Sequence, residues 1–175
     1  MTEPPQGLLK TVRVIDTIGE WFGRVIAWLI LPLVLGLAYE VISRYAFNAP
    51  TIWAYDTAYM LYGSHFMLGA GYTLLKKGHI RTDFFYENWS TRRKGMVDSF
   101  CYVFLFFPGM LLFLAAGWES AWHSVLIRET SEASAWRPPI WPFKLTIPVG
   151  AAFLILQGVS EMIKSLYAAR TGRQL

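Results

Sequence analysis

Long apolar stretches alternate with short polar segments along this chain, and this alternation is its main pattern. Each apolar stretch is long enough to cross a membrane as a helix, since about 20 residues rising 1.5 Å each cover a hydrocarbon layer of about 30 Å. The pattern predicts an all-α integral membrane protein with four transmembrane helices in a single membrane domain, residues 1–175. We place the spans at about 21–42, 52–75, 96–118 and 145–167.

The segment before the first span has a helical period of its own. Leu8, Val12 and Ile15 recur on one side of it, with charged residues on the other. This predicts an amphipathic helix at about 8–20 that lies in the membrane interface, and the alternative is a frayed tail with accidental periodicity. A mixture of aromatic and basic residues at 84–95 predicts a second interfacial segment. Since no small-residue cleavage site follows a short apolar core, we expect the first span to remain in the mature protein.

Proline and glycine residues mark where the predicted helices should bend or end. Pro32 lies in the middle of the first span and Pro108 in the middle of the third, and each removes a backbone hydrogen bond, which predicts a kink. Pro50 separates the first two spans, and Thr51 is placed to cap the second. Gly78 is expected to end the helix of the second span.

Composition agrees with a membrane protein. Hydrophobic residues make up 54% of the chain, aromatic residues 17% and charged residues 16%, and these proportions differ from those of soluble domains. The net charge is +4, but the basic residues lie in short blocks between apolar runs, which favours contact with membrane lipids over nucleic acid. The single Cys101 excludes disulfide frameworks and sites that need cysteine pairs.

Lys and Arg are distributed unequally between the two sides of this four-span arrangement. Twelve lie on the side that holds both termini and the 76–94 loop, and four on the other side. Because positively charged loops stay in the cytoplasm, both termini are predicted to be cytoplasmic and residues 119–143 periplasmic. No span repeats another's pattern, so the inverted repeat typical of a chain that transports by itself is not visible. The four outer basic residues are Arg44, Arg128, Arg137 and Lys144.

The sequence has no motif that indicates an enzyme, a metal site or a cofactor. Two other classes stay open. A haem- or quinone-binding membrane anchor of a redox enzyme would need two histidines at one depth, and His65 and His123 are expected at different depths. A small four-helix exporter would need a central carboxylate, whereas Glu40, Asp56 and Glu161 lie near span ends, where they can snorkel or pair with Lys or Arg.

Charged and aromatic residues at both ends of the second span are candidate contacts with a partner. On the outer side, Arg44 and Asp56 lie on either side of Trp53. Either the two charges pair and fix the outer turn, or Asp56 stabilises the positive end of its own helix. The inner candidates either dock to a partner's cytoplasmic face or contact lipid headgroups and cap the loop. They are Gly78, His79, Arg81 and Asp83.

Small residues in the second and fourth spans are candidate helix contacts, because glycine lets two backbones approach closely in lipid. Each contact could involve another helix of this chain or a helix of a partner. We expect Gly69 and Gly71 to lie at such a contact, with Gly150 and Gly158 as the next candidates.

Four motifs around the second span carry a family resemblance. R-Y-x-F-N-x-P precedes the span, W-x-x-D begins it, G-A-G lies within it and G-H-I-R-x-D follows it. In this arrangement the chain resembles the small membrane subunit (DctQ-like) of tripartite ATP-independent periplasmic (TRAP) transporters. The resemblance covers nearly the whole chain. Asp56 stands where most relatives have glutamate, which keeps the charge and shortens its reach.

The resemblance implies a complex of three components at the bacterial inner membrane. A larger membrane subunit would bind the substrate and sodium and move them, and a soluble periplasmic substrate-binding protein would deliver an organic acid. The small subunit would be a scaffold for the large one, with no substrate site, no cofactor and no enzymatic activity of its own.

Overall fold

Helices make up the regular structure of the described part of the chain, apart from one isolated antiparallel bridge between Thr130 and Pro139. The computed structural model describes residues 5–79, 86 and 88–175. The all-α fold class is therefore confirmed. The helices are α1 (Gln6–Ala27), α2 (Ile30–Ala46), α3 (Ala54–Leu75), α5 (Thr91–Cys101), the π-helical turn η1 (Tyr102–Phe106), α6 (Phe107–Leu126) and α7 (Trp141–Thr171).

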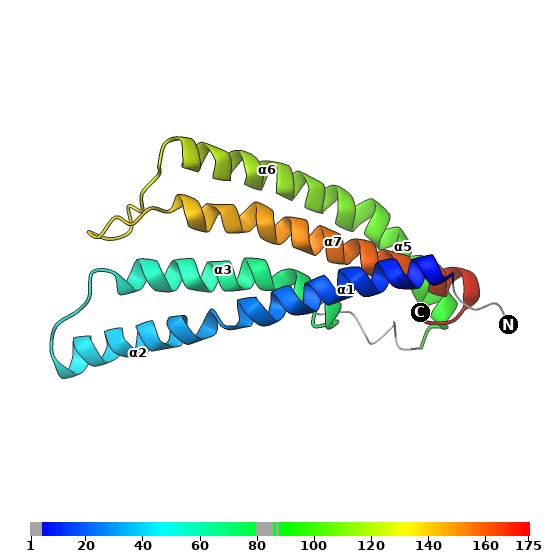
Figure 1. Cartoon of the computed structure of the whole chain (residues 1–175), viewed down its shortest axis with the longest axis horizontal. Coiled ribbons are helices and arrows are strands. Elements are labelled where there is room, and N and C mark those ends of the chain that lie inside the picture. The colour runs from blue at the N-terminus through cyan, green and yellow to red at the C-terminus, as the bar shows by residue number, and fades with distance from the viewer. Residues whose placement is uncertain (1–4, 80–85, 87) are drawn as a thin grey trace.

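The long helices lie side by side in a row and do not close into a bundle (Figure 1). Helix α2 packs on α3, α3 packs on α7, and α7 packs on α6, while α1 crosses α3 and α7 at one end of the row. Helix α7 is the common neighbour, because it also packs against α5 and η1. Helices α2 and α6 therefore form the two edges, and in α2 only Leu33 is buried.

The first apolar stretch is divided by a turn at Trp28 and Leu29. Pro32 has no N–H to donate to the carbonyl of Trp28 four residues earlier, and the N–H of Leu31 donates to that carbonyl instead, at 3.1 Å. The kink predicted at Pro32 thus occurs one turn before it. The boundary expected near residue 20 is not a helix end, since α1 runs unbroken through it to Ala27.

A second disturbance precedes Pro108. The N–H of Phe107 bonds to the carbonyl of Tyr102, five residues earlier, which makes a π-helical turn. Pro108 has no N–H and its ring crowds the preceding turn, and a local π-helical turn is one way for a helix to adjust to such a residue. The bend expected at Pro108 therefore takes the form of η1, and α5, η1 and α6 remain one continuous helical rod.

Helix α3 ends in a left-handed residue, but that residue is Lys77 and not Gly78. Lys77 has φ 56°, and the N–H of Gly78 donates to the carbonyl of Thr73 at 2.8 Å, which closes the last turn. Such a closing bond normally follows a residue in the left-handed region. The helix therefore ends where the sequence predicts, but the left-handed residue is Lys77, one position before Gly78.

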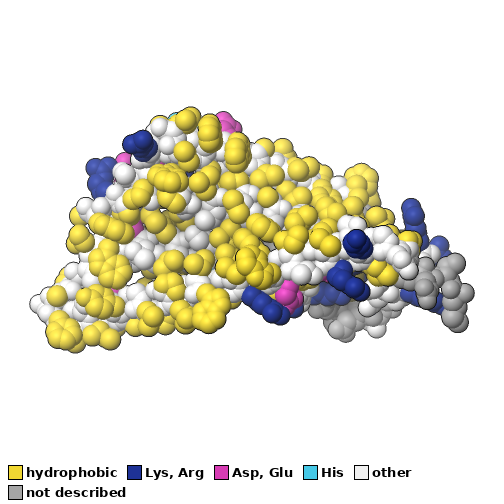
Figure 2. All heavy atoms as spheres, viewed as in Figure 1, with side chains coloured by type: hydrophobic (Ala, Val, Ile, Leu, Met, Phe, Trp, Pro, Cys, Tyr) yellow, Lys and Arg dark blue, Asp and Glu magenta, His cyan; other side chains and the backbone are white. Residues whose placement is uncertain are grey.

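Three helical stretches of the described residues are long and apolar enough to cross a membrane: Gln6–Ala46, Thr91–Leu126 and Trp141–Thr171. Helix α3 is not among them, although its 22 residues would extend about 33 Å, because tyrosines, Asp56, Ser64 and His65 make it less apolar. The count of four spans is therefore not confirmed and stays a prediction. Figure 2 shows hydrophobic side chains over most of the face in view, with most of the visible Lys and Arg toward its two ends.

Candidate functional site

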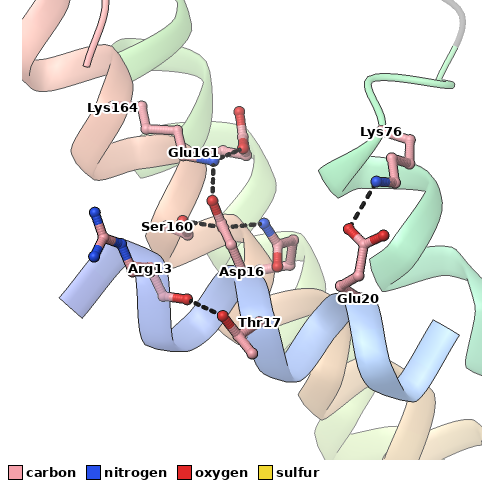
Figure 3. Close-up of polar contacts among 9 residues, drawn as sticks. Arg13, Asp16, Thr17, Glu20, Lys76, Ser160, Glu161 and Lys164 are labelled. Carbon is pink, nitrogen blue, oxygen red and sulfur yellow. Dashed lines mark hydrogen bonds and ion pairs between the residues drawn. The ribbon is translucent and has the colours of Figure 1, made fainter. Parts of the chain in front are cut away.

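A polar network joins α1 to α7 at the end of the row where both termini lie (Figure 3). Lys164 Nζ lies 2.7 Å from Asp16 Oδ2 and 2.6 Å from Glu161 Oε1. The other carboxylate oxygen of Asp16 accepts hydrogen bonds from Gln157 Nε2 at 2.9 Å and from Ser160 Oγ at 2.6 Å. Gln157, Ser160, Glu161 and Lys164 recur at helical spacing and therefore lie on one face of α7. This face binds the carboxylate of Asp16 in α1. We call Asp16, Gln157, Ser160, Glu161 and Lys164 the inner network.

The inner network is largely closed to solvent. Ser160, Gln157 and Glu161 are buried, and buried polar groups are costly unless they are paired. Here each has a partner within the network. Gly19 of α1 makes room for it, because a Cβ at that position would lie 2.8 Å from Gln157 Oε1. Glu161 pairs with Lys164, as one of the alternatives for a span-end carboxylate predicted, whereas no sequence pattern indicated Asp16 as part of the network.

A second, more exposed contact ties α1 to the end of α3. Lys76 Nζ lies 2.7 Å from Glu20 Oε2, and Arg24 lies 3.0 Å from the other oxygen of Glu20. Figure 3 shows Lys76 and Glu20 facing one another across the two helices. Because all three side chains are partly exposed, this contact stabilises the chain less than the inner network does.

Asp56 anchors the connection between α6 and α7. Its side chain is 1% exposed. Ser131 Oγ donates to Oδ1 at 2.5 Å, and Ser134 Oγ donates to Oδ2. Each serine oxygen in turn accepts a backbone N–H two residues further along, from Ala133 and Trp136. The loop of residues 127–140, which we call the outer loop, is therefore folded onto the start of α3.

Arg44 pairs with Glu40 and not with Asp56. Arg44 Nε donates to Glu40 Oε1 at 2.8 Å, and Glu40 Oε2 accepts the N–H of Thr51 at 2.9 Å and its hydroxyl. The proposed pair of Arg44 with Asp56 is thus wrong within this chain, because each has a closer partner. Glu40 therefore pairs with an arginine, which is one of the two alternatives predicted for the span-end carboxylates, and it also ties the end of α2 to the start of the next turn.

The turn between α2 and α3 is further fixed by Thr51 and Trp53. Thr51 Oγ1 accepts the N–H of Ala54, the first residue of α3, at 3.3 Å, but the N-cap position itself is Trp53, whose side chain makes no cap hydrogen bond. The ring of Trp53 stacks on Tyr39 of α2, with 5.8 Å between the ring centroids. Trp53 is therefore held within the chain, and Asp56 lies in the first turn of α3, where its charge also suits the helix dipole.

Removing the Asp56 carboxylate should loosen the outer loop. Asp56→Ala leaves the hydroxyls of Ser131 and Ser134 without their acceptor, at an expected cost of about 2–4 kcal/mol to the docked loop. Chymotrypsin should then cut after Trp136 several-fold faster than in the wild-type chain. Glu132→Ala, which changes an exposed charge in the same loop, is the matched control. Equal cleavage rates for wild type and Asp56→Ala would contradict the anchor.

The outer loop also carries a titratable contact. Lys144 Nζ lies 2.6 Å from Glu129 Oε2, and this hydrogen bond holds the pKa of the Glu129 carboxyl below its ordinary value of 4.5. A lowered folded-state pKa stabilises the loop at pH values above 4.5, and the contribution is lost as the pH falls below 4.5 through the lowered value.

We therefore expect amide hydrogen exchange in residues 128–140, corrected for the intrinsic rate, to rise on acidification below the ordinary pKa of glutamate. The effect should be under about 1 kcal/mol because the pair is partly exposed. Glu129→Gln should remove this pH dependence. The assignment fails if the wild type and the glutamine variant respond to pH in the same way.

Three of the four singled-out glycines lie at contacts inside the chain. A Cβ at Gly150 would lie 2.5 Å from the carbonyl oxygen of Met67 in α3, and one at Gly71 would lie 3.3 Å from the backbone of Phe153 in α7. Gly158 faces the ring of Phe106. Gly71 and Gly150 thus let α3 and α7 approach closely, as small residues do in membranes. Gly69 meets nothing within 4 Å, so its expected contact does not lie within this chain.

The inner loop and the histidines complete the candidate residues. His79 is exposed beside Gly78, while Arg81 and Asp83 lie outside the described residues. Nδ1 of His65 lies 3.2 Å from the carbonyl oxygen of Ile26. Since a carbonyl only accepts, Nδ1 donates here, next to the turn where α1 ends.

A match to a known protein family shows where this chain belongs. The profile that matches the chain is that of the DctQ component of tripartite ATP-independent periplasmic transporters, and it covers residues 33–167. The chain belongs to this family. It is a component of a transporter in the bacterial inner membrane, and the family is not one of enzymes. No curated protein matches the chain.

The matched region of this DctQ-family chain runs from Leu33 in α2 to Tyr167 in α7. It therefore contains the Asp56 anchor, the Glu40 contacts and the α7 side of the inner network. Helix α1 and Asp16 lie before it. A DctQ component acts within a tripartite system.

Proposed function

We propose that this DctQ-family chain is the small scaffold subunit of a sodium-coupled TRAP transporter that imports an organic acid. It pairs with a large membrane subunit, which carries the substrate and sodium sites, and it works with a periplasmic substrate-binding protein. It crosses the membrane four times with both termini in the cytoplasm. It carries no substrate site of its own.

The open row of helices is the observation that best supports a scaffold. A chain that transports alone surrounds its substrate, whereas here α2 and α6 lie at opposite edges and do not close over a central site (Figure 1). The face in Figure 2 is mostly apolar, and every long helix carries exposed hydrophobic side chains. In a membrane such faces are covered by lipid or by another protein, and a wide, flat arrangement gives a large subunit an extended surface to rest on.

The carboxylates also favour a scaffold over an exporter. A coupling carboxylate must take up and release an ion or a proton. Asp56 is bound by two serines, Glu40 by Arg44 and Thr51, and Glu161 by Lys164. Each of these carboxylates therefore already has a partner within this chain.

The proposed orientation has a direct test. Single cysteines at Glu132 in the outer loop and at Arg92 at the start of α5 are both at exposed positions, and Cys101 is replaced in the background. An impermeant maleimide applied to whole cells should label Glu132→Cys and spare Arg92→Cys until the membrane is permeabilised. The reverse pattern would overturn the orientation.

The scaffold proposal is tested by co-purification and reconstitution. The tagged chain should retain a large multispan subunit in mild detergent, and liposomes with both subunits and the binding protein should take up an organic acid when a sodium gradient is applied. Liposomes with this chain alone should match empty liposomes. Uptake by the isolated chain, or unimpaired uptake by the large subunit without it, would overturn the scaffold proposal.

A further inference from the structure

One face of α3 carries exposed aromatic residues at helical spacing. Tyr55, Tyr59, Tyr62 and Phe66 follow one another at steps of four, three and four residues. Their exposed fractions are 66%, 52%, 62% and 64%, in that order. Gly69 continues the same series three residues later. Side chains at such spacing lie along one side of a helix. We call these five residues the tyrosine face.

The tyrosine face borders a groove between α2 and α3. The groove has a volume of about 480 Å³, and Leu33 and Leu37 of α2 form its other wall. Glu40 and Arg44 lie at its outer end. Tyr59 also packs against Phe143 of α7, with 5.1 Å between the ring centroids. Neighbouring helices thus support the groove on two sides, while its opening is uncovered in this chain.

The tyrosine face carries three exposed hydroxyls along one helix side. Those of Tyr55, Tyr59 and Tyr62 bond to no residue that the structure describes. Tyr62 lies near the middle of α3, far from either helix end, where a hydroxyl gains little from acyl chains and prefers a hydrogen-bond acceptor. The first half of α2 and the first turns of α6 are different, since Leu31, Val34 and Leu35 of α2 and Leu111 and Leu112 of α6 are exposed and aliphatic, and the exposed tyrosines of α2, Tyr39 and Tyr45, lie in its second half.

Helix α3 is also less apolar than the other long helical stretches. It is the one long helix that falls outside the three stretches apolar enough to cross a membrane in the described part of the chain. Helices α2, α7 and α1 cover its other sides. A helix of this polarity is stable at bilayer depth when protein covers its remaining side as well.

We infer that a transmembrane helix of the large subunit docks in the α2–α3 groove along the tyrosine face. This rests on the proposed function, since it requires that the chain pair with a large subunit. The docked helix supplies hydrogen-bond acceptors, from serine, threonine or backbone carbonyls, to Tyr59 and Tyr62. Its backbone comes closest at Gly69, where a Cβ would meet nothing within 4 Å in this chain.

Photo-crosslinking tests the location directly. The transporter is expressed with p-benzoylphenylalanine in place of Tyr62, or in place of Leu112 on α6 as the control, since Leu112 is 73% exposed. The Tyr62 position should give a crosslink to the large subunit, and the Leu112 position should not. A crosslink from Leu112 alone, a Tyr62 crosslink only to lipid, or a Tyr62 crosslink to a second copy of this chain would each overturn the inference.

A matched pair of glycine variants tests the close approach. Neither Gly69 nor Gly109 of α6 has an atom within 4 Å of an added Cβ, so we expect leucine at either position to leave the isolated chain folded, which its elution as a monodisperse species checks. Gly69→Leu should lower the co-purified large subunit at least five-fold, and Gly109→Leu should leave it at the wild-type level. Equal yields for both variants would overturn the docking face. If the wild-type chain retains no large subunit at all, the proposed function itself fails.

Discussion

Gly150→Leu should unfold the contact between α3 and α7 in the isolated chain. An added Cβ at Gly150 would lie 2.5 Å from the carbonyl oxygen of Met67, and a backbone oxygen cannot rotate away as a side chain can. The two helices must separate, and forcing extra atoms into a packed contact costs about 1–3 kcal/mol or more. Because α7 packs against α1, α3, α5 and α6, we expect a loss of stability at the upper end of this range, about 3 kcal/mol.

The measurement is the thermal unfolding of the purified chain in detergent, monitored as the fraction of the protein that is still monodisperse after heating. Gly69→Leu is the control, since it makes the same chemical change on α3 where an added Cβ meets nothing within 4 Å. We expect Gly150→Leu to lower the midpoint by several degrees and Gly69→Leu to leave it unchanged. If the two variants melt together, the close approach of α3 and α7 at Gly150 is wrong.

Lys164→Ala should release α1 from α7. Lys164 is the cation that Asp16 and Glu161 share, so its removal leaves two neighbouring carboxylates without a counter-charge. Breaking a fully buried ion pair in this way costs about 3–5 kcal/mol. The side chains of Lys164 and Asp16 are 25% and 27% exposed, and this partial exposure reduces the expected loss to about 2 kcal/mol.

A cysteine at Val12 reports the release, because Val12 is a buried residue of α1. With Cys101 replaced, maleimide should label Val12→Cys at least ten-fold faster when Lys164 is alanine. Lys10→Ala removes an exposed lysine of α1 and should leave the rate unchanged. Adding Asp16→Asn to Lys164→Ala should slow the labelling again, because one of the two uncompensated charges is gone. Labelling that is insensitive to Lys164 would show that the inner network does not hold α1.

Local features of the fold could be predicted from the sequence. The apolar runs located the helices, and Pro32 and Pro108 marked the two places where helical hydrogen bonding changes. Each depends on residues within four or five positions of one another. The length of α1 could not be read in the same way, since the change from amphipathic to apolar pattern near residue 20 leaves the helix itself unbroken.

The polar contacts could not be predicted from the sequence, because the two partners of each contact are far apart in the chain. Asp56 binds serines 75 and 78 residues later, and Asp16 binds Gln157 and Ser160 at separations of 141 and 144 residues. Serine in a polar loop gives no signal that its hydroxyl is committed to a carboxylate. Glycine spacing likewise indicated that close contacts exist, but only the structure separates Gly71 and Gly150, which pack inside the chain, from Gly69, which does not.

The position of α7 at the centre of the row has a consequence for how the protein is made. The ribosome produces α1, α2 and α3 first and α7 last, so Asp16 has no cation from α7 until almost the whole chain has been synthesised. During that interval α1 can lie along the membrane surface, with its charged side in water. Insertion of α7 then brings Lys164 to Asp16, and Gly150 to the backbone of α3, in one late step. A chain that stops before Trp141 keeps its apolar stretches but lacks the helix against which α1, α3, α5 and α6 pack.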